Sequence, residues 1–242
     1  MGKNGARPGA GPHAWEACLL LAGALAKMGP KGVTAARALV LQFDAYLRPS
    51  EVLSVTRDDV TTKKRGTSLA YPDLVLTLAP QGTPDQPPTR RTKGGRFDES
   101  VVVADKASKL AGRGFVGQIV QNLIKRRRAQ QKLFDLTLAE YEDLFRKAML
   151  QTSLGPLSLV PHSARHGGPS TDAALQLRDA TSIQRRGRWE SERSVRRYEK
   201  HGKLTRQVAL MSSEQLADAK SLERSLPRLL GSMDKKDLTR SR

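Results

Sequence analysis

Apolar residues recur at helical spacing in the first third of the chain. One apolar stripe runs through residues 33–47 and consists of Val33, Ala36, Val40, Phe43 and Leu47. An apolar residue every three or four positions forms one face of a helix, so this segment is predicted to be helical, as is the segment 14–28. Pro49 suits the first turn of a helix but not its interior. A break is therefore expected at 47–49, with a new helix after it.

Two short runs show strand patterning instead. Residues 74–79 (LVLTLA) and 100–104 (SVVVA) are rich in branched apolar residues. A polar loop rich in proline and glycine separates them, and Gly94–Gly95 is expected to form its turn. These runs predict a β-hairpin or a three-stranded sheet.

The rest of the chain is predominantly helical in pattern. Residues 115–133 and 138–150 are predicted helices, and Thr137 and Glu140 have the spacing of a capping box at the start of the second. Further helices are expected at 170–177, 180–187, 191–200 and 213–225. The predicted fold class is α+β and mainly α-helical, with a small antiparallel sheet inserted near the N-terminal third. Residues 1–13 are rich in glycine and proline and are expected to be disordered.

Charge narrows the choice of partner. The chain has 42 Lys and Arg against 24 Asp and Glu, a formal charge of +18. Such a surplus favours binding to double-stranded nucleic acid, because each cation that meets a phosphate releases a counterion. An anionic membrane surface is the alternative, but the charge is spread along the chain rather than along one amphipathic face. No apolar run approaches the roughly 20 residues of a membrane span, so no membrane partner is expected.

Cellular location follows from two further features. Cys18 is the single cysteine, so no intrachain disulfide can form, which suits a reducing compartment. The apolar run that contains Cys18 has the outline of a signal peptide, but Glu16 at its edge and the basic chain argue against export. The protein is expected to be intracellular and located with DNA, in the nucleus if the host is eukaryotic.

Side chains suited to phosphodiester chemistry occur in four short segments. The segments are YLRPSEVL with Arg48 and Glu51, RRTKGGRF with Lys93, PHSARHGG with His162 and Arg165, and RRGRWESERSVRRYEK with Trp189 and Tyr198. Arginines can fork onto non-bridging phosphate oxygens, and a histidine and an indole N–H can add single hydrogen bonds. A phenol can attack phosphorus, and a lysine can protonate the departing alkoxide. No carboxylate cluster stands out, so no metal and no cofactor are expected.

The four segments resemble, in order, the motifs of the tyrosine site-specific recombinases, the phage-integrase family. YLRPSEVL resembles the first arginine box, HSARHGG the second, and the stretch from Ile183 through Gly187 and Trp189 to Tyr198 the last. The chain departs from the family in having Tyr46 where glycine is usual and Arg188 between Gly187 and Trp189. In that family a helical DNA-clamping domain usually precedes these motifs, and we expect this chain to lack it.

The resemblance implies a recombinase-type catalytic domain over residues 14–205. Residues 206–242 would form a C-terminal helix and basic tail that docks on a neighbouring copy, in a homo-tetramer bound to two DNA sites. Tyr198 would form a 3′-phosphotyrosyl link with DNA, Lys93 would be the general acid, and Glu51 and His166 would support the catalytic residues. The full set of catalytic candidates is Arg48, Lys93, His162, Arg165, Trp189 and Tyr198.

Competitors exist for two of these roles. Tyr141 is the next candidate nucleophile, and the general acid has basic rivals in Lys63, Lys64, Arg90, Arg91 and Arg96. Direct DNA contacts are expected from two basic groups, namely Lys125, Arg126, Arg127 and Arg128, and Arg185, Arg186 and Arg188.

Three functional alternatives remain open on the sequence. The first is an active recombinase or integrase, and the second is a catalytically inactive, transposon-derived DNA-binding relic. The third is a type IB topoisomerase-like enzyme, which shares the chemistry without strand exchange. Each candidate also has a purely structural interpretation, in which Tyr198 and Trp189 pack in the core, Arg48 interacts with a helix end and His162 bonds to backbone.

Overall fold

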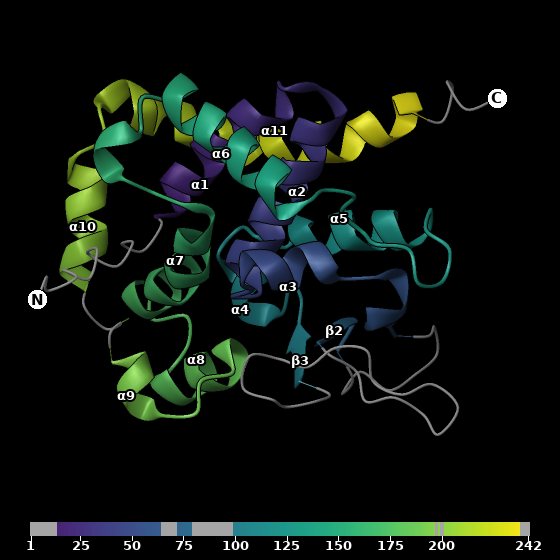
Figure 1. The fold of residues 1–242 in the computed structure, drawn as a ribbon. Coiled ribbons are helices and arrows are strands. Elements are labelled where there is room, and N and C mark those ends of the chain that lie inside the picture. The colour runs from purple at the N-terminus through teal and green to yellow at the C-terminus, as the bar shows by residue number, and fades with distance from the viewer. Residues whose placement is uncertain (1–13, 64–71, 79–98, 197, 199–200, 238–242) are drawn as a thin grey trace, which may run out of the picture.

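A computed structural model of the protein describes residues 14–63, 72–78, 99–196, 198 and 201–237. Within these ranges the fold is mainly helical, with one small antiparallel sheet (Figure 1). This confirms the predicted α+β, mainly helical class. Residues 1–13 lie outside the described part, so their predicted disorder stays a prediction. None of the described helices is both long enough and apolar enough to cross a membrane.

The described elements follow one another along the chain in the order given below. The helices are α1 (Trp15–Ala26), α2 (Gly29–Asp44), α3 (Pro49–Ser54), α4 (Lys106–Leu110), α5 (Phe115–Ile124), α6 (Leu138–Gln151), α7 (Pro161–Ala174), α8 (Ala180–Gly187), α9 (Glu192–Val195), α10 (His201–Ala209) and α11 (Ser213–Asp237). The strands are β1 (Val60–Thr62), β2 (Leu74–Leu78) and β3 (Glu99–Val102), and 3-10 turns occur at Arg57–Asp59 and Gly155–Leu157.

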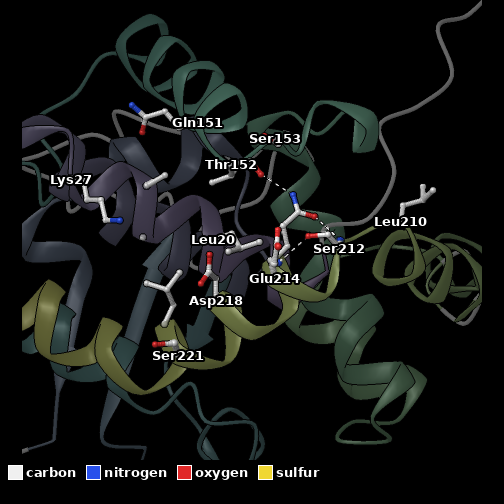
Figure 2. Close-up of a pocket in the computed structure, with 14 residues that line it drawn as sticks. Leu20, Lys27, Gln151, Thr152, Ser153, Leu210, Ser212, Glu214, Asp218 and Ser221 are labelled. Carbon is white, nitrogen blue, oxygen red and sulfur yellow. Dashed lines mark hydrogen bonds between the residues drawn. The ribbon is translucent and has the colours of Figure 1, made fainter.

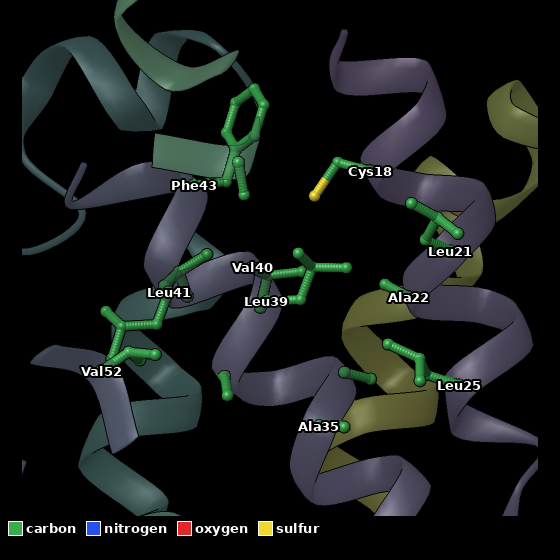
Figure 3. Packing of buried hydrophobic residues seen from close by; sticks show 14 of the residues in the cluster. Cys18, Leu21, Ala22, Leu25, Ala35, Leu39, Val40, Leu41, Phe43 and Val52 are labelled. Atoms are coloured by element: carbon green, nitrogen blue, oxygen red, sulfur yellow. The ribbon is translucent and has the colours of Figure 1, made fainter. Parts of the chain in front are cut away.

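The hydrophobic core is built around α1. Every residue of α1 except Glu16 is buried, because α2 and α11 pack against it from different sides (Figure 3). A helix that is apolar on nearly all sides, such as this one, is stable only when it is enclosed. The apolar face of α11, which includes Ala219, Leu226 and Leu230, is buried in the core of its own chain. Docking of residues 206–242 on a second copy stays a prediction.

The sheet has the order β1-β2-β3 with antiparallel pairing throughout. Leu76 pairs with Val60 on one side and with Val101 on the other. Alternate residues of β2 face the core, namely Leu74, Leu76 and Leu78, as the period of two requires. Both predicted strands are confirmed, and β1 is a third strand that the sequence pattern did not single out.

Local signals located most helix starts correctly. Pro49 is the first residue of α3, and Thr137 caps α6 with Glu140 in the predicted capping box. α8 covers the predicted range 180–187. α7 begins well before the predicted 170, with Pro161 in its first turn, and α4 and α10 were not predicted.

Two predicted helices are shorter than expected. The helix predicted over 115–133 ends at Ile124, because the chain then turns back to pair with the segment after α3: Arg57 N donates to Gln131 O and Leu133 N donates to Val55 O. The basic run 125–128 therefore lies in a turn rather than on a helix. Of the helix predicted over 191–200, only the single turn α9 is helical among the described residues.

A buried network of arginines and carboxylates holds α2, α7 and α8 together. Asp172 on α7 accepts hydrogen bonds from Tyr46 Oη, from Arg113 Nη2 at 2.5 Å and from Arg178 Nε at 2.7 Å. Asp44, at the end of α2, accepts bonds from Arg113 Nε and Arg186 Nη2, each at 3.2 Å. Removing one member of such a network leaves a charge buried without its partner, which costs about 3–5 kcal/mol. The network thus fixes the positions of α2, α7 and α8 relative to one another.

Candidate functional site

Arg48 and Glu51 lie at the start of α3. Arg48 is the N-cap, and the Glu51 carboxylate accepts both the Arg48 backbone N–H at 2.7 Å and Arg48 Nη1 at 2.5 Å. Pro49 begins the helix and sets this geometry, because its fixed φ suits the first turn. The Arg48 side chain is 27% exposed, so its guanidinium group is held by Glu51 and still faces solvent.

Arg165 comes from the middle of α7 and is almost fully buried. Its Nη1 donates to Tyr46 O at 2.6 Å and to Glu51 Oε2 at 3.3 Å, and its Nη2 donates to Gly187 O at 2.9 Å. Backbone carbonyls from two other segments and one carboxylate therefore orient this guanidinium group. Because Arg48 and Arg165 both contact Glu51, the two predicted arginines lie on the same side of the molecule.

Burial and like charges act together on Arg165. Burial, together with the nearby guanidinium groups of Arg188 and Arg48, lowers the pKa of Arg165 to about 10, although Glu51 opposes the shift. Arg165 remains a cation at neutral pH. A site in which several guanidinium groups share one carboxylate has excess positive charge and favours an anion.

Tyr198 is packed between His166 and Trp189. Its Oη lies 2.8 Å from His166 Nδ1, and its ring stacks on the His166 ring with centroids 5.7 Å apart. The Trp189 ring lies 4.7 Å from the Tyr198 ring, and Tyr198 is only 2% exposed. His162, one turn before His166 on α7, is exposed, and its ring meets the His166 ring edge-on at 5.0 Å.

Trp189 links the tyrosine to the arginines. The Arg165 guanidinium carbon lies 5.2 Å from the centre of the Trp189 ring, within cation–π range. The ring lies directly against Gly187, where an added Cβ would come within 1.8 Å of a ring carbon. A glycine at 187 is therefore required for Trp189 to occupy this place.

A second close approach brings α7 against the end of α2. A Cβ at Gly168 would lie 2.2 Å from Phe43 O and 2.6 Å from a Tyr46 ring carbon. Gly168 thus allows the HSARHGG helix to pack directly on the segment that precedes Arg48. The HSARHGG segment is in this way brought into contact with Tyr46 of the YLRPSEVL segment.

Most of the predicted catalytic set converges in space. A continuous chain of contacts joins Arg48, Glu51, Arg165, Trp189, Tyr198, His166 and His162. Lys93 and four of its rivals, Lys64, Arg90, Arg91 and Arg96, lie outside the described residues. The remaining rival, Lys63, follows β1, and its backbone N–H donates to Asp73 O. Assignment of the general acid stays a prediction.

The rival nucleophile Tyr141 lies elsewhere. It is fully buried in the core, and its Oη donates to Gln42 Oε1 at 2.9 Å. Burial raises the pKa of Tyr141 well above its usual value. This environment favours a neutral, structural phenol.

Two of the expected DNA contacts do not fit their positions in the fold. Arg186 is buried, and its guanidinium group is bonded to Asp44, Asp105 and Val102 O. The Arg188 side chain is 4% exposed and is bonded to Glu51. In this arrangement the donors of both arginines are bonded within the protein, so they stabilise the interior rather than face a DNA phosphate. The remaining five, Lys125, Arg126, Arg127, Arg128 and Arg185, are exposed or half-buried.

Three residues contribute more to the candidate site than the sequence predicted. His166 was expected only to support the site, yet it contacts Tyr198 directly. Tyr46 supplies a carbonyl to Arg165 and stacks near Trp189, with ring centroids 6.3 Å apart. Arg188 was assigned to DNA but joins the arginine cluster. Tyr46 and Arg188 are the two positions at which the chain departs from the recombinase motifs. That departure was the sequence signal that could have identified both as contributors to the site.

Two pockets open on the described surface, one away from the predicted site residues and one beside Tyr198. One of about 660 Å³ lies between α1, the end of α6 and α11, where Gln215 Nε2 donates to Thr152 O (Figure 2). None of the predicted site residues lines it. A second pocket, of about 380 Å³, has Tyr198 in its wall together with Ile183 and Val195. The tyrosine is thus bordered by an open hollow on the α8–α9 side.

The described residues contain no group of three or more His, Cys, Asp or Glu side chains arranged to hold a metal ion. No protein-family model matches the chain, and no curated protein has significant sequence similarity to it.

Proposed function

We propose that this protein cleaves and rejoins DNA strands through a covalent link between a DNA phosphate and Tyr198. The observation that carries the proposal is the convergence of Arg48, Arg165, Trp189 and Tyr198, which come from three separate segments, around one carboxylate and one histidine. A phosphodiester is anionic, and its transition state gains charge on the non-bridging oxygens, so clustered guanidinium groups stabilise it.

The proposed reaction needs no metal. Tyr198 Oη attacks phosphorus, and its proton passes to His166 Nδ1 when that imidazole is neutral. The bond from phosphorus to the 5′ oxygen breaks, and the leaving oxygen takes a proton from a general acid, for which Lys93 is the candidate. The 3′-phosphotyrosyl link keeps the energy of the phosphodiester, so a 5′-hydroxyl from the same or another strand reverses the step. In this proposal the active form is a homo-tetramer on two DNA sites.

One observation favours a second candidate function, a DNA-binding protein without catalysis. Tyr198 is 2% exposed, and its hydroxyl is bonded to His166, so it must leave this position before it reaches a phosphate. Arg165 likewise directs its donors at Tyr46 O, Gly187 O and Glu51. A protein locked in this arrangement would bind duplex DNA and leave it intact.

A nicked DNA substrate separates the two candidates. Cleavage near the nick releases a short fragment, which traps the protein on DNA as an adduct that survives SDS. The unmodified protein is expected to form the adduct, and Tyr198→Phe to lose it while keeping its affinity for DNA, because only the attacking oxygen is removed. Tyr141→Phe is the matched control and should still form the adduct.

Each remaining outcome decides against the first proposal in a different way. DNA binding without any adduct by the unmodified protein would support the non-catalytic function. An adduct that persists in Tyr198→Phe would mean that another residue is the nucleophile.

A further inference from the structure

Arg188 occupies a backbone position that favours glycine. It is the C-cap of α8 with φ 56° and ψ 41°, in the left-handed region, and its N–H donates to Arg185 O at 3.1 Å to close the helix. A residue with a Cβ is strained there, and glycine or asparagine is usual. Strain that persists at a non-glycine residue often marks a side chain with a task.

The Arg188 side chain points inward and joins three elements. Its Nη2 donates to Glu51 Oε2 on α3 at 2.8 Å, and its Nη1 donates to Arg186 O on α8 at 3.2 Å. Its Nε lies 3.7 Å from Glu99 Oε2, at the first residue of β3. With 4% of the side chain exposed, these contacts are shielded from salt and solvent.

Arg188 and Arg165 share one oxygen of Glu51. Glu51 Oε2 receives Arg188 at 2.8 Å and Arg165 at 3.3 Å, while Oε1 receives Arg48 at 2.5 Å. The carboxylate therefore separates three cations that would otherwise repel one another. Burial by itself would raise the pKa of Glu51, but the guanidinium groups of Arg188, Arg165 and Arg48 outweigh it and hold the pKa below its usual value.

We propose that Arg188 is a positioning residue, which holds the Glu51 carboxylate where it orients Arg48 and Arg165 and which anchors the start of β3 through Glu99. The contribution of Arg188 to DNA cleavage rests on the function proposed above. The effect of Arg188 on the position of Glu51 does not depend on that function. Arg188 in this role touches no phosphate; it acts through Glu51. A displacement of about 1 Å in a positioned catalytic group can cost about 100-fold in rate.

The action on Glu51 is measurable in the DNA-free protein. The readout is the pKa of the Glu51 side-chain carboxyl, followed by carbon-13 NMR during an acid titration. Arg188→Gly relieves the strain of the left-handed backbone, which offsets part of the stability lost with the buried ion pair, so the variant should still fold. The Glu51 pKa should rise because one of the three guanidinium groups that contact this carboxylate is gone. Arg188→Lys keeps the positive charge but loses the planar guanidinium group with its several donors, so a smaller rise in the Glu51 pKa is expected. Arg224→Ala removes an exposed charge on α11 that makes no contact with Glu51, and it should leave the Glu51 pKa unchanged.

Adduct formation on nicked DNA is the second measurement on the same variants. Arg188→Gly should slow it about 100-fold, and Arg188→Lys should recover part of the rate. A Glu51 pKa that is the same in Arg188→Gly as in the unmodified protein overturns the positioning role. If the Glu51 pKa moves but the unmodified protein forms no adduct, the positioning role stands and the proposed DNA cleavage fails.

Discussion

Gly187 shows how a single missing side chain decides the position of a functional one. The Trp189 ring occupies the space where a Cβ at residue 187 would be, and the same ring contacts both Arg165 and Tyr198. No rotamer of a larger residue at 187 avoids this clash, because Cβ itself is the obstructing atom. Gly187, in the last of the four segments, thus has a packing role that does not depend on the function of the protein.

We expect Gly187→Ala to displace the Trp189 ring. Overpacking of this kind costs about 1–3 kcal/mol of stability, and the loss of the stack with Arg165 should also slow adduct formation. Tryptophan fluorescence quenching by acrylamide reports the increased exposure of the ring. Gly202→Ala on α10 is the control, because a Cβ there meets no atom within 4 Å. Equal quenching in Gly187→Ala and in the unmodified protein would contradict the packing argument.

At the scale of elements, Asp105 joins the start of α4 to α8 and to the segment between α7 and α8. Its carboxylate caps α4 by accepting Ser108 N at 3.0 Å, and it accepts a two-pronged hydrogen bond from Arg178 at 2.6 and 2.5 Å. Arg186 adds a contact at 3.3 Å. Burial alone would raise the pKa of Asp105, but the bonds from Arg178 and the charge of Arg186 lower it well below 3.8.

The depressed pKa sets the pH range in which Asp105 stabilises the fold. Its contribution is fully present above the ordinary Asp value of 3.8 and is lost as the pH falls through the lower folded-state pKa. Asp105→Asn keeps the cap but loses the charge, and should cost roughly 3 kcal/mol at neutral pH. We expect the difference in melting temperature between the two proteins to shrink as the pH falls below 4.

An exposed carboxylate provides the comparison. Asp143 on α6 forms ion pairs with Arg146 and Lys147 in solvent, where such pairs contribute little. Asp143→Asn should change the melting temperature slightly at every pH. A difference for Asp105→Asn that stayed constant from pH 7 to pH 3 would show that its charge does not stabilise the folded state.

At the scale of the whole molecule, the charge of +18 is distributed unevenly between interior and surface. Arg113, Arg165 and Arg186 are buried with carboxylate partners, so they stabilise the fold. The run Lys125–Arg128 lies in a turn beside the segment that follows α3, where its cations are exposed or half-buried. If the protein binds DNA as proposed, surface cations of this kind would release counterions from the DNA.

We expect affinity for duplex DNA to fall steeply with salt. Replacing residues 125–128 by alanine should reduce the slope of log affinity against log salt by about one unit for each phosphate that the variant no longer neutralises, for any DNA sequence. The control replaces three exposed cations of α11, namely Lys220, Arg224 and Arg228, and should leave the slope unchanged. Equal slopes for the 125–128 variant and the unmodified protein would place this run away from DNA.

The sequence alone determined the features that depend on near neighbours in the chain. Pro49 and the Thr137–Glu140 box located helix starts, and apolar periodicity located α2, because caps, fixed φ angles and helix faces are local properties. The same reasoning failed at residues 125–133. There the helix ends because a distant segment, 55–57, pairs with the chain, and no local signal reports that pairing.

Tertiary structure alone decided which side chain meets which. Arg186 and Arg188 are neighbours of exposed Arg185 in a uniformly basic stretch, yet both turn inward because Asp44 and Glu51 lie beneath them. His166 and Tyr198 likewise meet only in the folded chain, where their rings stack and Tyr198 Oη lies 2.8 Å from His166 Nδ1. Residues that are far apart in sequence have no characteristic spacing, so the sequence could not pair these arginines with their carboxylates. Burial and electrostatics in the folded chain, rather than the residue types, placed the arginines in the interior.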